Sequence, residues 1–118
     1  MAALASGVFT GTSLAFFDEA FTGDLDAIYA LTSGKRWIIS GWDLTVHANS
    51  VVCPIRLELG TRVVAASHMP VHGATAGYPK NTWQLVGVNL TGMINEALNI
   101  AGGGTAAVLN GTIWCQQV

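Results

Sequence analysis

The chain is short of the residues that normally cover an exposed helix. Glutamate, lysine, arginine and glutamine are good helix formers and face solvent on helix surfaces. The 118 residues nevertheless include only 5 Lys or Arg and 7 Asp or Glu. Glycine, threonine and β-branched residues are frequent instead, and these residues favour turns and strands. The composition therefore predicts a fold built from β-strands.

Two segments alternate between apolar and polar residues, as a strand with one buried face does. The clearer one, 53–59, has apolar residues at every second position: Cys53, Ile55, Leu57 and Leu59. Residues 36–47 alternate as well, and their predicted inner face carries Ile38, Trp42, Leu44 and Val46. The same alternation predicts that Trp37 and Ile39 lie on the outer face.

Further strand-like runs follow at short intervals, at 25–31, 62–66, 82–90 and 106–117. In the last run Leu109, Ile113 and Cys115 share one face, which places Trp114 on the other. Turn-forming residues separate the runs at 32–35, 60–61 and 101–105, and 67–81 reads as a long irregular loop. Short strands with turns every ~8–12 residues predict an all-β, antiparallel jelly-roll sandwich of about seven or eight strands. No segment is suited to the crossover helices of a parallel sheet.

The first 22 residues lack clean alternation, so we expect an N-terminal arm at 1–22 and the jelly-roll domain at 23–118. All four phenylalanines lie in this stretch: Phe9, Phe16, Phe17 and Phe21. Exposed phenylalanines on an arm would need a neighbouring subunit to cover them. Packing into the domain's own core is the equal alternative, and the sequence leaves both open.

The ionisable residues do not form a recognisable catalytic or metal-binding pattern. His68 and His72 have the spacing of a zinc-binding helix, but Pro70 interrupts it and no glutamate follows His68. The one acidic cluster does not match a calcium-binding loop and fits a solvated turn; it comprises Asp18, Glu19, Asp24 and Asp26.

The two cysteines, Cys53 and Cys115, lie in strand-like runs without the cationic neighbour or helix N-terminus that lowers a thiol pKa. A disulfide between them stays open, because sequence cannot fix the required geometry. We therefore expect a protein that is not an enzyme, with no catalytic residue, no metal and no cofactor.

The low charge has two general explanations, a membrane or an assembly. No uninterrupted apolar stretch of ~18 residues occurs, which argues against a membrane helix. Five scattered basic residues and a net charge of −2 argue against nucleic-acid binding. Protein interfaces are depleted of charge and enriched in aromatics, so self-association is the favoured reading. The candidate interface residues are the outward tryptophans, their neighbour and the arm phenylalanines: Trp37, Ile39, Trp114, Phe9, Phe16 and Phe17.

The order of turn and strand motifs resembles that of small virion proteins of tailed bacteriophages with a jelly-roll, tumour-necrosis-factor-like fold. The similarity covers about 23–118, and residues 1–22 are not matched. Its motifs are the Gly23-Asp24 turn, Ile28-Tyr29, the run 33–39, the run 95–100 and the final-strand sequence 111–114.

Members of that family are trimeric cement, or decoration, proteins of phage heads. The resemblance implies a homotrimer that binds the major capsid protein on the capsid surface of a virion assembled in the bacterial cytoplasm. It transfers no catalytic residue. Two alternatives remain: a tail- or fibre-associated trimeric adhesion module, with 67–81 as its variable loop, and a small-molecule-binding jelly roll of the cupin type. The dispersed histidines argue against a cupin metal site.

Overall fold

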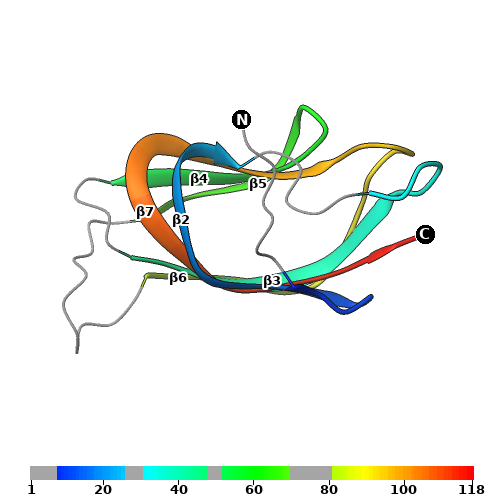
Figure 1. The fold of residues 1–118 in the computed structure, drawn as a ribbon, viewed down its shortest axis with the longest axis horizontal. Coiled ribbons are helices and arrows are strands. Elements are labelled where there is room, and N and C mark those ends of the chain that lie inside the picture. Colours follow the sequence, from blue (N-terminus) through cyan, green and yellow to red (C-terminus); the bar gives the residue numbers. More distant parts are fainter. Residues whose placement is uncertain (1–7, 26–30, 48–51, 70–80) are drawn as a thin grey trace.

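The computed structural model describes residues 8–25, 31–47, 52–69 and 81–118, and these residues form seven antiparallel strands without a helix (Figure 1). The strands are β1 (Val8–Phe9), β2 (Ser13–Leu25), β3 (Trp37–His47), β4 (Cys53–Leu59), β5 (Arg62–Met69), β6 (Asn81–Thr91) and β7 (Leu98–Gln117).

The strand pairs are nested along the chain. The innermost pair is β4 with β5, the next is β3 with β6, and the outermost is β2 with β7, all antiparallel. Nested antiparallel pairs describe one long ribbon, and rolling up such a ribbon produces a jelly roll. The alternation of residues 53–59 is confirmed, because β4 buries every second residue against the core.

Two layers arise because β7 is long enough to belong to both. Its first residues, 98–102, pair with β4, whereas 108–117 pair with β3. One sheet therefore has the order β1-β2-β7-β3-β6 and the other joins β7 to β4 and β5. Counting the two parts of β7 separately gives eight strands in a sandwich of five and three. Figure 1 shows β2 and β7 curving together from the lower layer into the upper one.

A single apolar core fills the space between the layers. Its largest fully buried side chains come from β2, β3, β4 and β7; they are Trp37, Trp42, Phe16, Leu14, Ile39, Leu44, Ile55, Leu57, Leu59, Leu98 and Ile100. The predicted sandwich is thus confirmed, with both sheets contributing to one core.

The expectation of an N-terminal arm is wrong for the described residues 8–25, because β1 and β2 belong to the sandwich. β1 and β2 pair with each other, and β2 continues without a break across the expected boundary at residues 22 and 23. β2 could not be predicted from the sequence because its register against β7 shifts twice, between Phe16 and Glu19 and between Thr22 and Asp24. Each shift interrupts the two-residue period on which a strand prediction depends. Residues 1–7 lie outside the described residues.

The connections also differ in part from expectation. Residues 101–105, expected as a turn, lie inside β7. The strand expected at 25–31 is represented by the end of β2 alone, since 26–30 lie outside the described residues and Leu31 is not in a strand. Most of the expected loop 67–81 also lies outside them, and β5 extends to Met69. The turns at 32–35 and 60–61 are present.

Candidate functional site

The candidate interface residues fall into two groups in the structure. Trp37 and Ile39 are fully buried in the core, so the prediction that they lie on an outer face is wrong within one subunit. Phe16, at 1% exposed, packs into the domain's own core, which was one of the two alternatives for the arm phenylalanines. Phe9 is half-buried against Trp37, with ring centroids 5.5 Å apart. Only two of the six, Phe17 and Trp114, are exposed, at 71% and 37%.

A β-bulge in β3 explains the wrong face for Trp37 and Ile39. Ile39 lies opposite Cys115 of β7 and Gly41 lies opposite Trp114, so Ser40 is an extra residue in the ladder. One extra residue reverses the inward and outward positions that follow it. Trp37 and Ile39 before the bulge, and Trp42 after it, therefore all face the core. Ile38, predicted inward, is on the opposite side and is partly exposed.

The outer face of the five-stranded sheet carries Trp114 in a row of paired residues, and Phe17 lies in the register shift of β2 between Phe16 and Glu19. Residues directly opposite each other in antiparallel strands lie on the same face. Trp114 lies opposite Ser13 on one side and Gly41 on the other, and Gly41 in turn lies opposite Val86. A second row runs from Val8 through Ala15, Thr112 and Asp43 to Gln84. We call this surface the outer sheet face: Val8, Ser13, Ala15, Phe17, Ile38, Gly41, Asp43, Gln84, Val86, Thr112, Trp114 and Gln116.

A hollow lies in this surface close to Trp114. Its volume is about 220 Å³, and its lining combines apolar and neutral polar groups; the residues are Thr12, Ile38, Ser40, Cys115 and Gln116. Ser40 Oγ donates a 3.3 Å hydrogen bond to the Trp114 carbonyl oxygen at its edge. An exposed indole beside an uncharged hollow can give a protein contact shape complementarity.

Charge is distributed unevenly between the two outer surfaces. Within the outer sheet face as defined, Asp43 is the one ionisable side chain, and Asp18 lies beside Phe17 at its margin. The opposite sheet instead exposes a charged pair, since Arg56 Nε lies 3.0 Å from Glu58 Oε2. Among the residues of its rows, the surface that carries Trp114 therefore has a single ionisable side chain.

The described residues offer little for catalysis or metal binding. Within these ranges no three His, Cys, Asp or Glu side chains lie close enough together to hold a metal ion. His68 is exposed on β5, and His72 lies outside the described residues. Both cysteines are free and buried, and burial raises the pKa of the Cys115 thiol to about 12. A thiol with so high a pKa is protonated at neutral pH and is a poor nucleophile.

The sequence reasoning missed Val8, Val86 and Ile38 as members of the outer sheet face. For Ile38 the available signal was the Ser40-Gly41 pair inside the strand, because a glycine there often marks a bulge. A Cβ on Gly41 would lie 2.6 Å from the Leu85 carbonyl oxygen, so this position brings β3 and β6 unusually close.

Comparison with known proteins finds no match: no family model, no curated protein and no solved structure is similar to this chain. Among the described residues, no helix has the length and apolar character needed to cross a membrane.

Proposed function

We propose that this chain is a non-enzymatic structural protein that associates with copies of itself through the outer sheet face. The observation that carries the proposal is the exposed Trp114 beside a hollow on a surface nearly free of charge. Interface centres are depleted of charged residues and enriched in tryptophan. The outer sheet face has both properties, and the charged outer surface of the other sheet has neither.

A second copy is the partner that best fits the charge of this surface. The chain carries a net charge of −2, so two copies repel each other weakly at long range. Contact through the outer sheet face brings few like charges together, because Asp43 is the one carboxylate in its rows. A basic partner would find more carboxylates elsewhere on the protein.

The molecule is large enough for a closed ring of copies. A standard interface buries about 800 Å² on each partner. Two such patches per subunit would cover roughly a quarter of the 5908 Å² surface of the described structure. In such a ring, Trp114 of one subunit would enter the hollow of its neighbour. Trp114 and the hollow lie side by side on the same sheet.

The role we propose for this assembly is that of a homotrimeric cement protein on the head of a tailed bacteriophage. The sequence resemblance to such proteins supports this role, and the jelly-roll fold is compatible with it. The trimer would bind the major capsid protein across subunit seams and oppose the outward pressure of packed DNA by added buried surface. No reacting residue is required.

Replacing Trp114 with glutamate tests the association. Trp114→Glu places a carboxylate in the centre of the outer sheet face, where burial against a second copy would leave it unpaired. We expect the variant to be a folded monomer in native mass spectrometry. Val63→Glu is the matched control, because Val63 is 53% exposed on β5 of the other sheet. An unchanged oligomer in Trp114→Glu, or equal dissociation in Val63→Glu, would contradict the proposal.

The capsid role needs a separate experiment on virus particles. Heads and tails of the phage that encodes this chain can be separated and their proteins identified by mass spectrometry. We expect the chain in the head fraction, in fixed proportion to the major capsid protein. Recovery with tails or fibres would favour the adhesion alternative, and absence from particles would contradict a virion role.

A further inference from the structure

Three connections meet at one end of the sandwich, which we call the loop end. They are residues 31–36 before β3, 60–61 between β4 and β5, and 92–97 between β6 and β7. Figure 1 shows the first and the third of them at the right-hand end of the molecule, near the C-terminus. This end lies beyond the strands and adjoins the outer sheet face near Ile38 and Gln116, but the two surfaces share no residue.

Hydrogen bonds join the first and third connections into one unit. Gly34 N donates to Asn95 Oδ1 and Asn95 N donates to the Lys35 carbonyl oxygen, each at 2.8 Å. Gly92 N also donates to the Trp37 carbonyl oxygen at 2.8 Å, which fixes the start of 92–97 to β3. Asn95 has a φ of 67°, a left-handed conformation that asparagine adopts more readily than most residues.

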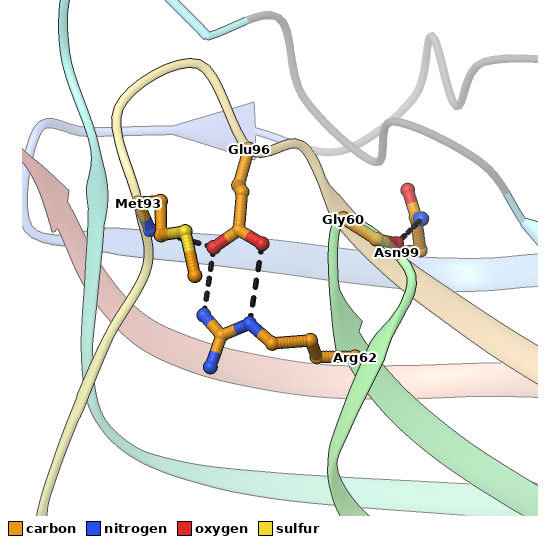
Figure 2. A network of polar contacts seen from close by, with 5 residues as sticks. All are labelled: Gly60, Arg62, Met93, Glu96 and Asn99. Atoms are coloured by element: carbon orange, nitrogen blue, oxygen red, sulfur yellow. Dashed lines mark hydrogen bonds and ion pairs between the residues drawn. The ribbon is translucent and has the colours of Figure 1, made fainter.

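The second connection is tied to the third by a charged network, drawn in Figure 2. The Arg62 guanidinium donates to both carboxylate oxygens of Glu96, at 2.7 and 3.2 Å. Glu96 also accepts a 2.6 Å hydrogen bond from Met93 N. Asn99 Nδ2 donates to the Gly60 carbonyl oxygen at 2.9 Å, and so braces the adjoining turn.

Two large apolar side chains are exposed on the third connection, 92–97. Met93 is 60% exposed and Ile94 is 52% exposed. Burying them in a partner would gain apolar contact, and their backbone is already held by the hydrogen bonds above. A preorganised segment loses less conformational entropy on binding than a mobile one.

The loop end is also positively charged, although the protein is acidic. Among the side chains that the structure describes there, three are cationic, Lys35, Arg36 and Arg62, and one is a carboxylate, Glu96, which pairs with Arg62. The nearby Glu58 is already paired with Arg56 at 3.0 Å. The loop end therefore carries positive charge next to Met93 and Ile94, whereas the outer sheet face has almost no charge.

We infer that the loop end is a second docking surface, for a protein partner whose contact region combines apolar side chains with carboxylates. Complementary charge directs such an encounter and fixes its orientation, and Met93 with Ile94 supplies the apolar anchor. Three cations are too few for a nucleic-acid footprint. The inference holds whether or not the chain self-associates. Under the proposed function this surface would face the major capsid protein, and that identification alone rests on the proposed function.

A peptide titration followed by nuclear magnetic resonance tests the inference on the whole chain. The probe is a synthetic peptide of alternating glutamate and leucine, and its control replaces every glutamate with lysine. We expect amide shifts confined to 33–36, 60–62 and 92–97, with at least about tenfold tighter binding of the glutamate peptide at low salt. Binding should weaken as salt is added, because exposed charges are screened.

Two variants separate the apolar and the charged contributions. M93S/I94S is expected to weaken binding of the glutamate peptide by about tenfold or more, while V52S/V86S, which alters two valines of similar exposure away from the loop end, leaves it unchanged. K35E/R36E is expected to reverse the preference in favour of the lysine peptide. Equal affinity for the two peptides, shifts on other surfaces, or binding to vesicles of an anionic phospholipid but not to the glutamate peptide would each overturn the inference.

Discussion

Trp37 and Trp42 are the two largest side chains of the core, and each carries a polar atom that the core does not satisfy. Both are fully buried, and neither indole Nε1 has a hydrogen-bond partner among the described residues. Leaving a buried donor unpaired costs about 1–3 kcal/mol. Their ring contacts offset this cost: Trp37 packs edge-on against Phe9, and Trp42 packs against Trp83 with centroids 5.1 Å apart.

Replacement of Trp37 with phenylalanine or alanine separates the cost of the donor from the benefit of burial. Trp37→Phe removes the unpaired donor and keeps a large ring, so we expect a change in unfolding free energy within about 1 kcal/mol. Trp37→Ala leaves a cavity and should cost about 3–5 kcal/mol. Urea denaturation measures both. If Trp37→Ala lowers the unfolding free energy by less than about 1 kcal/mol, Trp37 lies on the surface and the bulge at Ser40 is refuted.

At the scale of elements, the close approach of β7 to β3 depends on Gly111. Its φ is 127°, and a Cβ built there would overlap the Asp43 carbonyl oxygen of β3. We expect Gly111→Ala to destabilise the fold by about 3 kcal/mol or more, because backbone strain and overlap add. Gly87→Ala is the control, since Gly87 has a φ of 74° but nothing within 4 Å of its Cβ position.

The two glycine variants are compared by thermal and urea unfolding. The Gly87 substitution should cost only about 1 kcal/mol, from backbone strain alone. Equal losses in the two variants would mean that β7 and β3 are not as close as described.

The Arg62–Glu96 ion pair, which joins β5 to the connection before β7, predicts a dependence of stability on pH. The hydrogen bond from Arg62, followed by that from Met93 N, lowers the Glu96 pKa below its ordinary 4.5. A carboxyl whose pKa is lower in the folded state stabilises the protein above that ordinary value and loses this effect as pH falls through the lowered pKa.

The variant that reports on this pair is Glu96→Gln. Its unfolding free energy should be below that of the unsubstituted protein at pH 7, by the modest amount typical of exposed ion pairs. The difference should shrink below pH 4.5 as the Glu96 carboxyl takes up a proton. Arg62→Gln should show the same trend, because it removes the partner. A difference that stays constant from pH 7 to pH 3 would contradict the described geometry.

The elements that could be predicted from sequence are those with unbroken alternation. β4 follows its predicted boundaries and inner face, because nothing interrupts its two-residue period between Cys53 and Leu59. The strand β3 is predicted, and its inner face is confirmed after the bulge at Trp42, Leu44 and Val46. The faces of the residues before Ser40 are predicted wrongly, and β2 is not predicted because two register shifts divide it. Alternation reports local geometry, whereas the position of a bulge depends on the partner strand, which the sequence does not reveal.

The candidate surface could be predicted only in part for the same reason. The exposure of Trp114 followed from the buried face of Leu109, Ile113 and Cys115, and the structure confirms it. Its neighbours come from strands that are distant in sequence, such as Val86 on β6 and Val8 on β1. Pairing of these strands with β3 and β2 decides which residues share a face.

At the scale of the whole molecule, one rolled ribbon produces surfaces of different character. The five-stranded sheet presents a nearly uncharged surface with an exposed indole, the other sheet presents an ion pair, and the loop end combines cations with two exposed apolar residues. A protein that bridges copies of itself and a larger shell would need two such non-overlapping contact surfaces. We therefore propose self-association through the outer sheet face and partner binding at the loop end.

Sedimentation equilibrium of the unsubstituted chain over a wide concentration range shows whether neighbouring copies cover the outer sheet face in solution. We expect a mass three times the 12.3 kDa of one chain, maintained on dilution to low micromolar concentration. A mass of 12.3 kDa at every concentration, with the protein folded and soluble, would contradict it.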